Sequence, residues 1–254
     1  MAIVAADIVA YGSASMPDDD TPTQIGGAID LTIRVVFTDI VSTDEIEIVS
    51  DSASDTTETI TGHGRNAAGE LVNDVATLNG TTPVVVTGTD FERILKLIKS
   101  TGTVGTITIR DDGTDTTIAT MEPALLEIRR PFYDSAAEAS GGSTRTYHEK
   151  IFFKNNHATL TLTSATIDEQ ADPESVVAFD LESTLDGSDD NGGGNNRQVA
   201  PGGYTFTSAI KNVANSQNLT ALAAQGCWLE LTLVAGLASN NTSFTMRVNG
   251  NTVA

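Results

Sequence analysis

Residues 106–110 are Thr-Ile-Thr-Ile-Arg, an alternation of polar and apolar side chains with a period of two. This period is typical of a β-strand that places one face in a core. Clusters of Gly, Asn, Asp and Pro separate such runs along the chain and predict turns between them. The sequence therefore predicts an all-β fold rather than a parallel α/β sheet. The same alternation recurs at residues 29–37, 45–49, 159–163, 228–233 and 243–248.

The spacing of these runs predicts two tandem β-sandwich domains, Ig-like or jelly-roll-like, preceded by an extended N-terminal arm. The arm covers residues 1–28, which are rich in small residues and too polar to form a core alone. The first sandwich covers residues 29–133 and the second covers 145–254. Small polar residues at 134–144 predict a linker or long loop, and the Gly, Asn and Asp residues of 186–203 predict a mobile surface loop.

Two segments allow alternative interpretations. Phe91, Ile94, Leu95 and Ile98 have the spacing of one helix face, and Asp90 is a suitable N-cap. A bent strand through the same residues is the alternative. Residues 215–224 fit either a short helix or a polar loop.

The charge of the chain excludes several kinds of partner. Its 254 residues include 14 Lys and Arg against 34 Asp and Glu, which gives a net charge of −20. Nucleic-acid and anionic-membrane binding both need clustered basic residues, so we expect neither partner. The N-terminus lacks the basic region of a secretory signal, and no apolar run is long enough to span a bilayer. We therefore expect synthesis in a cytoplasm and no membrane contact.

No residue pattern points to catalysis, so we expect no enzyme activity and no cofactor. Cys227 is the single cysteine, which excludes an intrachain disulfide, and it is expected to be a small buried apolar residue. Trp228 lies in an alternating run and is expected in the core rather than on a sugar-binding surface. Residues 61–69 lack the Lys of a phosphate-binding loop and predict a hairpin with a turn at Ala68 and Gly69.

The best metal candidates are Asp186, Asp189 and Asp190, whose carboxylates suit Ca²⁺. The spacing departs from that of an EF-hand loop, because Asn191 stands where Gly is required and Arg197 where Glu is required. We therefore predict no metal site here, with a calcium-binding loop as the weaker alternative.

Three stretches resemble virion structural proteins of tailed bacteriophages, of the type that decorates or cements the head. They are YGSASMPDDD at 11–20 with 26–31 and 34–37, TGHGRNAAGE at 61–70 with 78–84, 91–94 and 105–109, and YHEKIFFKNN at 147–156. The resemblance covers most of the chain, and its motifs are short and dominated by turns. No catalytic residue comes with it.

The resemblance implies a non-enzymatic head decoration protein on the outer surface of the capsid. Its expected partners are the major capsid protein and copies of itself, a trimer being favoured and a dimer possible. An arm of this kind binds a neighbouring surface and can be removed without unfolding the rest. The alternatives are another virion component, at the head–tail junction or in the tail, and a host-attachment or carbohydrate-binding module. The residues expected to make the arm contacts are Tyr11, Met16, Pro17, Asp18, Asp19 and Asp20.

Overall fold

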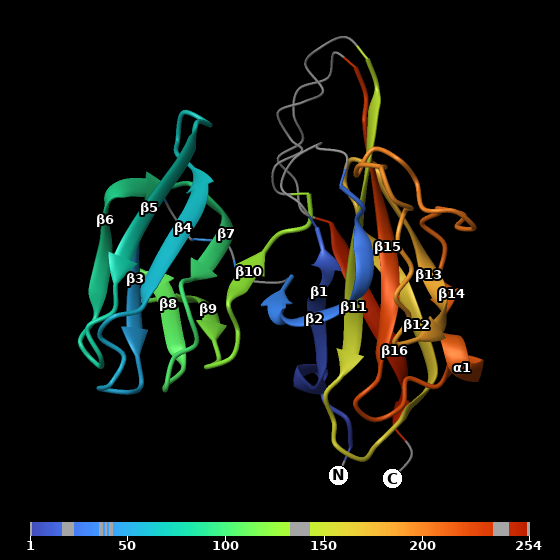
Figure 1. The fold of residues 1–254 in the computed structure, drawn as a ribbon, viewed down its shortest axis with the longest axis horizontal. Helices are drawn as coiled ribbons and strands as arrows, with labels where there is room; N and C mark the ends of the chain where they lie inside the picture. Colours follow the sequence, from blue (N-terminus) through green and yellow to red (C-terminus); the bar gives the residue numbers. More distant parts are fainter. Residues whose placement is uncertain are drawn as a thin grey trace. The chain divides into compact units, whose positions relative to one another are not determined.

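The computed structural model describes residues 2–16, 23–35, 38, 40, 43–132, 143–235 and 244–252, without the side chains of 87 and 89. These residues are almost entirely β-strands and loops, arranged in three sheets, so the all-β class is confirmed (Figure 1). The chain divides into two compact units. Unit 1 contains residues 1–30 and 134–254, and unit 2 contains residues 31–133. Among the described residues no helix is long and apolar enough to cross a membrane.

Unit 1 is built on long antiparallel strands around β11. β11 pairs with β15 without interruption from Arg145 opposite Leu233 to Lys154 opposite Ala224. The order in this part of the sheet is β13 (Val177–Leu185), β15 (Ala224–Leu233), β11 (Arg145–Asn155), β1 (Ile8–Ser15) and then β2 (Gly26–Arg34). A second sheet has the order β14 (Lys211–Asn212), β12 (Leu162–Ala171), β16 (Thr245–Thr252). A 3-10 turn, η1 (Ala5–Asp7), precedes β1.

The N-terminal residues differ from the arm predicted for residues 1–28. β1 pairs antiparallel with β11, with Tyr11 opposite Phe152, and the Tyr11 side chain is buried. As their composition indicates, the small residues of β1 form no core by themselves. β1 belongs to the fold because its backbone groups pair with β11, whose apolar side chains supply the core.

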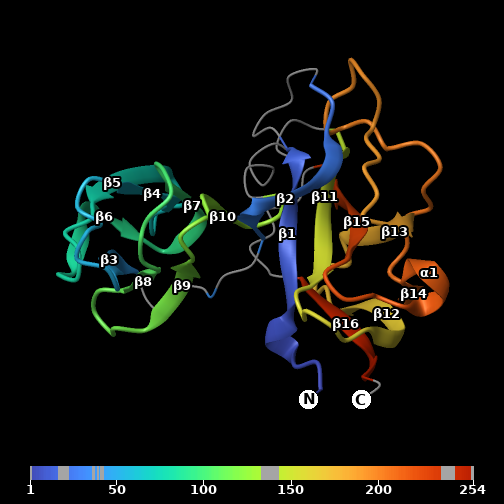
Figure 2. The same ribbon diagram turned by 60° about the horizontal axis from the view of Figure 1, so that its bottom comes forward.

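Unit 2 has two sheets. One runs β5 (Leu71–Thr77), β4 (Thr59–Arg65), β7 (Arg93–Lys99), β10 (Glu127–Arg129), and β10 then pairs in parallel with the end of β2 (Figure 2). The other runs β6 (Val84–Phe91), β3 (Asp44–Ser50), β8 (Ile107–Asp111), β9 (Thr117–Met121). Buried side chains from both sheets form one core, including Ile46, Ile48, Ile60, Phe91, Ile94, Leu97, Ile107 and Ile109.

The glycines of the TGHGRNAAGE stretch have a packing role in unit 2. A Cβ at Gly64 would lie 2.5 Å from the Phe91 ring, and one at Gly62 would lie 3.2 Å from it. At Gly64 a side chain would force the ring or the backbone to shift, and at Gly62 it would make a tight contact, so the two glycines let β4 lie directly on this ring. The predicted hairpin is confirmed, because β4 and β5 pair along their full length, and Asn66 Oδ1 accepts hydrogen bonds from the Ala68 and Glu70 amides in the turn.

The ambiguous segment at residues 91–98 is a strand. β7 pairs with β4 on one side and β10 on the other, so the helix interpretation is wrong. β7 is buried on both of its faces, so apolar residues follow one another in its sequence instead of alternating with polar ones. Ile94, Leu95 and Leu97 are all buried. In the 215–224 segment the only helical element is α1 (Ala214–Gln217), a single turn with positive φ at three of its residues. The expected linker at 134–144 lies almost entirely outside the described residues.

Candidate functional site

The predicted arm residues include one that is part of unit 1 and several that lie outside the described residues. Tyr11 lies inside β1 and its hydroxyl accepts a hydrogen bond from Asn156 Nδ2 at 3.2 Å, so its side chain belongs to unit 1 itself. Met16 directly follows β1. Pro17, Asp18, Asp19 and Asp20 lie outside the described residues. Their expected contact with a capsid or a neighbouring copy stays a prediction.

The 186–203 loop binds residues 23–27, the segment in which β2 begins. The Ile25 amide donates to Asn191 Oδ1 at 2.9 Å, and the Asn191 amide donates to the Ile25 carbonyl at 3.2 Å. The Gly27 amide donates to the Asp189 carbonyl at 2.9 Å. We call residues 189–191 the latch, because they join the start of β2 to the rest of unit 1.

The loop that carries the latch was expected to be mobile, yet many hydrogen bonds hold it. Asn191 is 5% exposed, and its Nδ2 donates to the carbonyls of Asn196 and Val199. The Asn195 side chain donates to the Asn191 carbonyl. Short amide side chains bond readily to nearby backbone, so the residues that indicated flexibility are the ones that hold the loop in place.

Lys150 lies beneath the latch and is fully buried. Its Nζ donates to Glu182 Oε1 at 2.6 Å, to the Gly27 carbonyl at 2.7 Å and to the Asp189 carbonyl at 2.9 Å. Burial lowers the pKa of Lys150, while the neighbouring Glu182 carboxylate acts in the opposite direction. An ammonium group has three donors, and here each has an acceptor. One side chain therefore connects β11, β13, the latch and the start of β2.

Aromatic rings and glycines surround this ion pair. Lys150 Nζ lies 4.8 Å from the centre of the Phe152 ring and 5.6 Å from that of Trp228, the residue opposite Lys150 on β15. A Cβ at Gly187 would lie 2.5 Å from Glu182 Oε2, and a Cβ at Gly226 would lie closer still. The buried carboxylate thus occupies space that only glycines leave open.

The three calcium candidates are each engaged with protein donors. Asp186 Oδ1 accepts from the Ala224 amide, Asp189 Oδ2 from the Tyr204 hydroxyl at 2.6 Å, and Asp190 Oδ1 from the Gly192 amide. Burial raises the pKa of Tyr204, and its bond to Asp189 adds to this effect. Within the described ranges no group of three or more His, Cys, Asp or Glu side chains is placed to hold a metal ion. The structure therefore does not bring these carboxylates together around one point.

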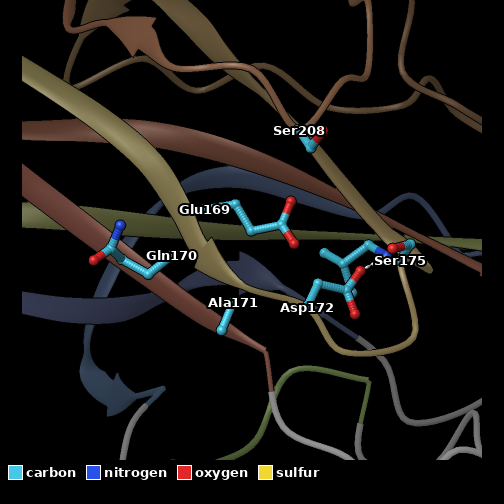
Figure 3. Close-up of a pocket in the computed structure, with 7 residues that line it drawn as sticks. Glu169, Gln170, Ala171, Asp172, Ser175 and Ser208 are labelled. Carbon is cyan, nitrogen blue, oxygen red and sulfur yellow. Dashed lines mark hydrogen bonds between the residues drawn. The ribbon is translucent and has the colours of Figure 1, made fainter.

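A hollow of about 290 Å³ lies where β12 ends and β13 begins (Figure 3). Asp172 Oδ2 accepts from the Val177 amide at 2.7 Å, whereas Glu169 Oε2 is buried with no hydrogen-bond partner. Burial and the nearby charge of Asp172 raise the pKa of Glu169. Two carboxylates and two hydroxyls can accept a polar group here. The residues that line the hollow are Glu169, Gln170, Ala171, Asp172, Ser175, Val177 and Ser208.

The sequence by itself does not point to this hollow. Glu169 and Asp172 are ordinary acidic residues in a chain that has 34 of them, and only the β12–β13 turn brings them together. The one local signal is their three-residue spacing just before Pro173.

His148 provides a second buried polar contact between β11 and the 186–203 loop. Its amide donates to the Arg197 carbonyl at 2.7 Å, and its Nδ1 lies 3.2 Å from the same oxygen. Nε2 lies 3.2 Å from Glu230 Oε2, and the ring packs 5.3 Å from that of Phe206. Burial lowers the pKa of His148 despite its polar neighbours.

The expected core positions of Cys227 and Trp228 are confirmed, since both are completely buried. Burial also raises the pKa of the Cys227 thiol, which keeps it protonated and unreactive. Trp228 offers no exposed ring on which a sugar could stack. No protein-family model, no curated protein and no solved structure matches the chain.

Proposed function

We propose that the protein is a non-enzymatic structural component of a tailed-bacteriophage particle, a decoration or cement protein on the outer surface of the head. Its proposed partners are the major capsid protein and further copies of itself, with a trimer favoured over a dimer. It is proposed to be made in the host cytoplasm and to be built from two β-sandwich domains. The observation that carries this proposal is the resemblance of residues 61–70, whose glycines pack against Phe91 in unit 2.

The contacts around Lys150 support a structural role. They join residues that are far apart in sequence, Gly27, Lys150, Glu182 and Asp189, at one buried point. A subunit that stabilises a pressurised shell must resist local unfolding. Pulling the start of β2 or the latch away from β11 would take acceptors away from the buried Lys150 ammonium group, which costs free energy, so these contacts oppose local separation of the segments.

The net charge of −20 supports a protein that stays dispersed until a surface binds it. Charge repulsion between free copies extends only about 8–10 Å at physiological ionic strength. This repulsion therefore does not prevent contact between copies that are bound side by side on a shell. Binding of these copies to the shell is then strengthened by many simultaneous contacts.

Co-sedimentation of the full chain with capsids that lack it tests the proposal. We expect saturable binding that excess unlabelled protein displaces, with added density at repeated symmetry positions of the shell in electron cryomicroscopy. Density at a single vertex would replace the decoration role with a head–tail junction role. Absence of capsid binding would overturn the proposal and favour a tail or host-attachment role.

A further inference from the structure

We propose that Asp44 and Asp111 form a cation-binding site in unit 2, and that calcium is the ion that it takes. Asp44 begins β3, and Asp111 ends β8, the strand between β3 and β9 (Figure 1). Asp111 pairs with Ile46, and Asp44 lies two residues before Ile46, so both aspartates are on the core face of this sheet, where the apolar core ends. The site concerns unit 2 alone and does not depend on capsid binding.

The two carboxylates lie close to one another beside Gly113. A Cβ added at Gly113 would collide with Asp44 Oδ2 and would lie 3.6 Å from Asp111 Oδ1. The glycine therefore leaves room for the Asp44 carboxylate next to that of Asp111. Two negative charges in this arrangement repel each other, and a cation bound between them removes the repulsion.

Asp111 carries the strongest evidence, because its carboxylate is buried and only half satisfied. The residue is 0% exposed, and its Oδ1 accepts hydrogen bonds from the Thr114 amide at 2.8 Å and from the Thr114 hydroxyl at 2.9 Å. Its Oδ2 is buried as well, and no described donor reaches it. Burial of a carboxylate without a compensating partner is costly, so a positive ion at Oδ2 stabilises this arrangement.

The described part of the chain supplies no cation to this pair. No Lys, Arg or His among the described residues forms an ion pair with Asp44 or Asp111. Arg110 is the neighbouring basic residue, but successive strand residues face opposite ways, so it lies on the other face of β8. There it pairs with Glu47 and, at 3.3 Å, with Asp115. The balancing charge must therefore come from solution.

Calcium suits these ligands better than magnesium or zinc. Ca²⁺ accepts carboxylate, carbonyl and water oxygens in irregular geometry, whereas Mg²⁺ requires a near-ideal octahedron and Zn²⁺ is bound largely by nitrogen and sulfur. Residues 112–116 form the exposed turn between β8 and β9, so an ion can enter from solvent and complete its coordination with water and turn carbonyls. Because only two carboxylates take part, we expect a dissociation constant on the order of 10⁻⁴–10⁻³ M.

Isothermal titration calorimetry of the full chain with calcium chloride tests the site directly. We expect saturable binding at physiological ionic strength, and at least tenfold weaker binding in Asp44→Asn and in Asp111→Asn, whose amide oxygen can still accept both bonds from Thr114. Asp190→Asn is the matched control, because it removes one carboxylate of the 186–203 loop and should leave the affinity unchanged. Absence of saturable binding, or loss of binding in Asp190→Asn alone, overturns the proposal.

Thermal unfolding gives a second measurement that separates the two units. Tryptophan fluorescence reports unit 1, which contains the only tryptophan, Trp228, whereas circular dichroism reports both units. Calcium at about ten times its dissociation constant should raise the midpoint of the unit 2 transition by about 5 °C and leave the fluorescence transition in place. The calcium-free transition of Asp111→Asn shows that this variant is folded. An equal shift in Asp111→Asn, or with Mg²⁺ at the same ionic strength, would assign the effect to general charge screening and overturn the proposal.

Discussion

A single residue, Lys150, connects four parts of unit 1. Removing its charge leaves the Glu182 carboxylate buried without its cation, and it leaves the Gly27 carbonyl without the Lys150 donor, while the Asp189 carbonyl keeps only the Gly27 amide. We expect Lys150→Met to lower the free energy of unfolding of unit 1 by about 3–5 kcal/mol. Urea unfolding followed by tryptophan fluorescence measures this, because Trp228 is the only tryptophan and lies in unit 1.

Lys154→Met is the matched control for this change. Lys154 lies on the same strand, and its Nζ donates to the Leu222 carbonyl at the surface. We expect a loss below about 1 kcal/mol for this exposed contact. Similar losses for the two variants would mean that the buried ion pair contributes nothing special to stability.

His148 predicts a pH dependence of stability. Its pKa is lowered in the folded protein, so the unfolded chain takes up the proton first as the pH falls below about 6.5. The free energy of unfolding of unit 1 should therefore decrease between pH 7.5 and 5.5. The Arg197 carbonyl and the Glu230 carboxylate lie beside the ring, and together they only partly offset the effect of burial on this pKa.

Urea midpoints at several pH values measure this effect. We expect His148→Gln to flatten the decrease over this pH range, although the variant is less stable overall. His157→Gln makes the same chemical change outside the buried contact and should keep the decrease. A pH dependence that survives in His148→Gln would assign it to other groups.

At the scale of elements, β1 carries the clearest prediction. Deleting residues 2–16 removes a strand from beside β11 and takes Tyr11 out of the core. We expect the truncated chain to lose cooperative unfolding of unit 1 and to show the red-shifted emission of an exposed Trp228. A detachable arm predicts the opposite result, namely a folded and soluble protein.

A shorter deletion, of residues 2–4, is the control for this truncation. It removes the exposed Val4 ahead of η1 and leaves β1 complete. Tryptophan emission and the unfolding midpoint should stay close to those of the full chain. A folded unit 1 after the longer deletion would show that β1 is dispensable.

Strand positions could be predicted from the sequence where one face is buried and the other is exposed. Alternation at residues 45–49 and 106–110 corresponds to β3 and β8, whose burial also alternates. The pattern gave less guidance for β1 and β7. β1 consists largely of small residues, and β7 is buried on both faces, so neither shows a clean period of two.

The buried ion pair between Lys150 and Glu182 could not be predicted from the sequence for a different reason. Lys150 and Glu182 are 32 residues apart, and nothing local indicates that a Lys in an apolar run meets a buried carboxylate. The Asp, Asn and Gly residues of 186–203 do predict a loop. Their composition does not show whether their side chains face water or bond to neighbouring backbone.

For the whole molecule, the division into two units predicts two unfolding transitions. Tryptophan fluorescence reports unit 1, and circular dichroism reports both units. We expect Gly64→Ala to lower the stability of unit 2 by about 1–3 kcal/mol, because its Cβ meets the Phe91 ring and the Arg93 carbonyl. The transition seen by fluorescence should stay in place.

Gly202→Ala controls for the loss of a glycine. A Cβ at this position meets nothing within 4 Å, so we expect little change in either transition. A shift of the fluorescence transition in Gly64→Ala would show that the units unfold together.

The interruption of unit 1 by unit 2 has a consequence during synthesis on the ribosome. β1 leaves the ribosome roughly 130 residues before β11, the strand with which it pairs. At about 5–20 residues per second, this delay lasts on the order of ten seconds. All of unit 2 emerges in that interval and is free to fold while β1 waits without its partner. The nascent chain is therefore most exposed to misassembly and to chaperone binding after unit 2 is complete and before residue 155 has emerged.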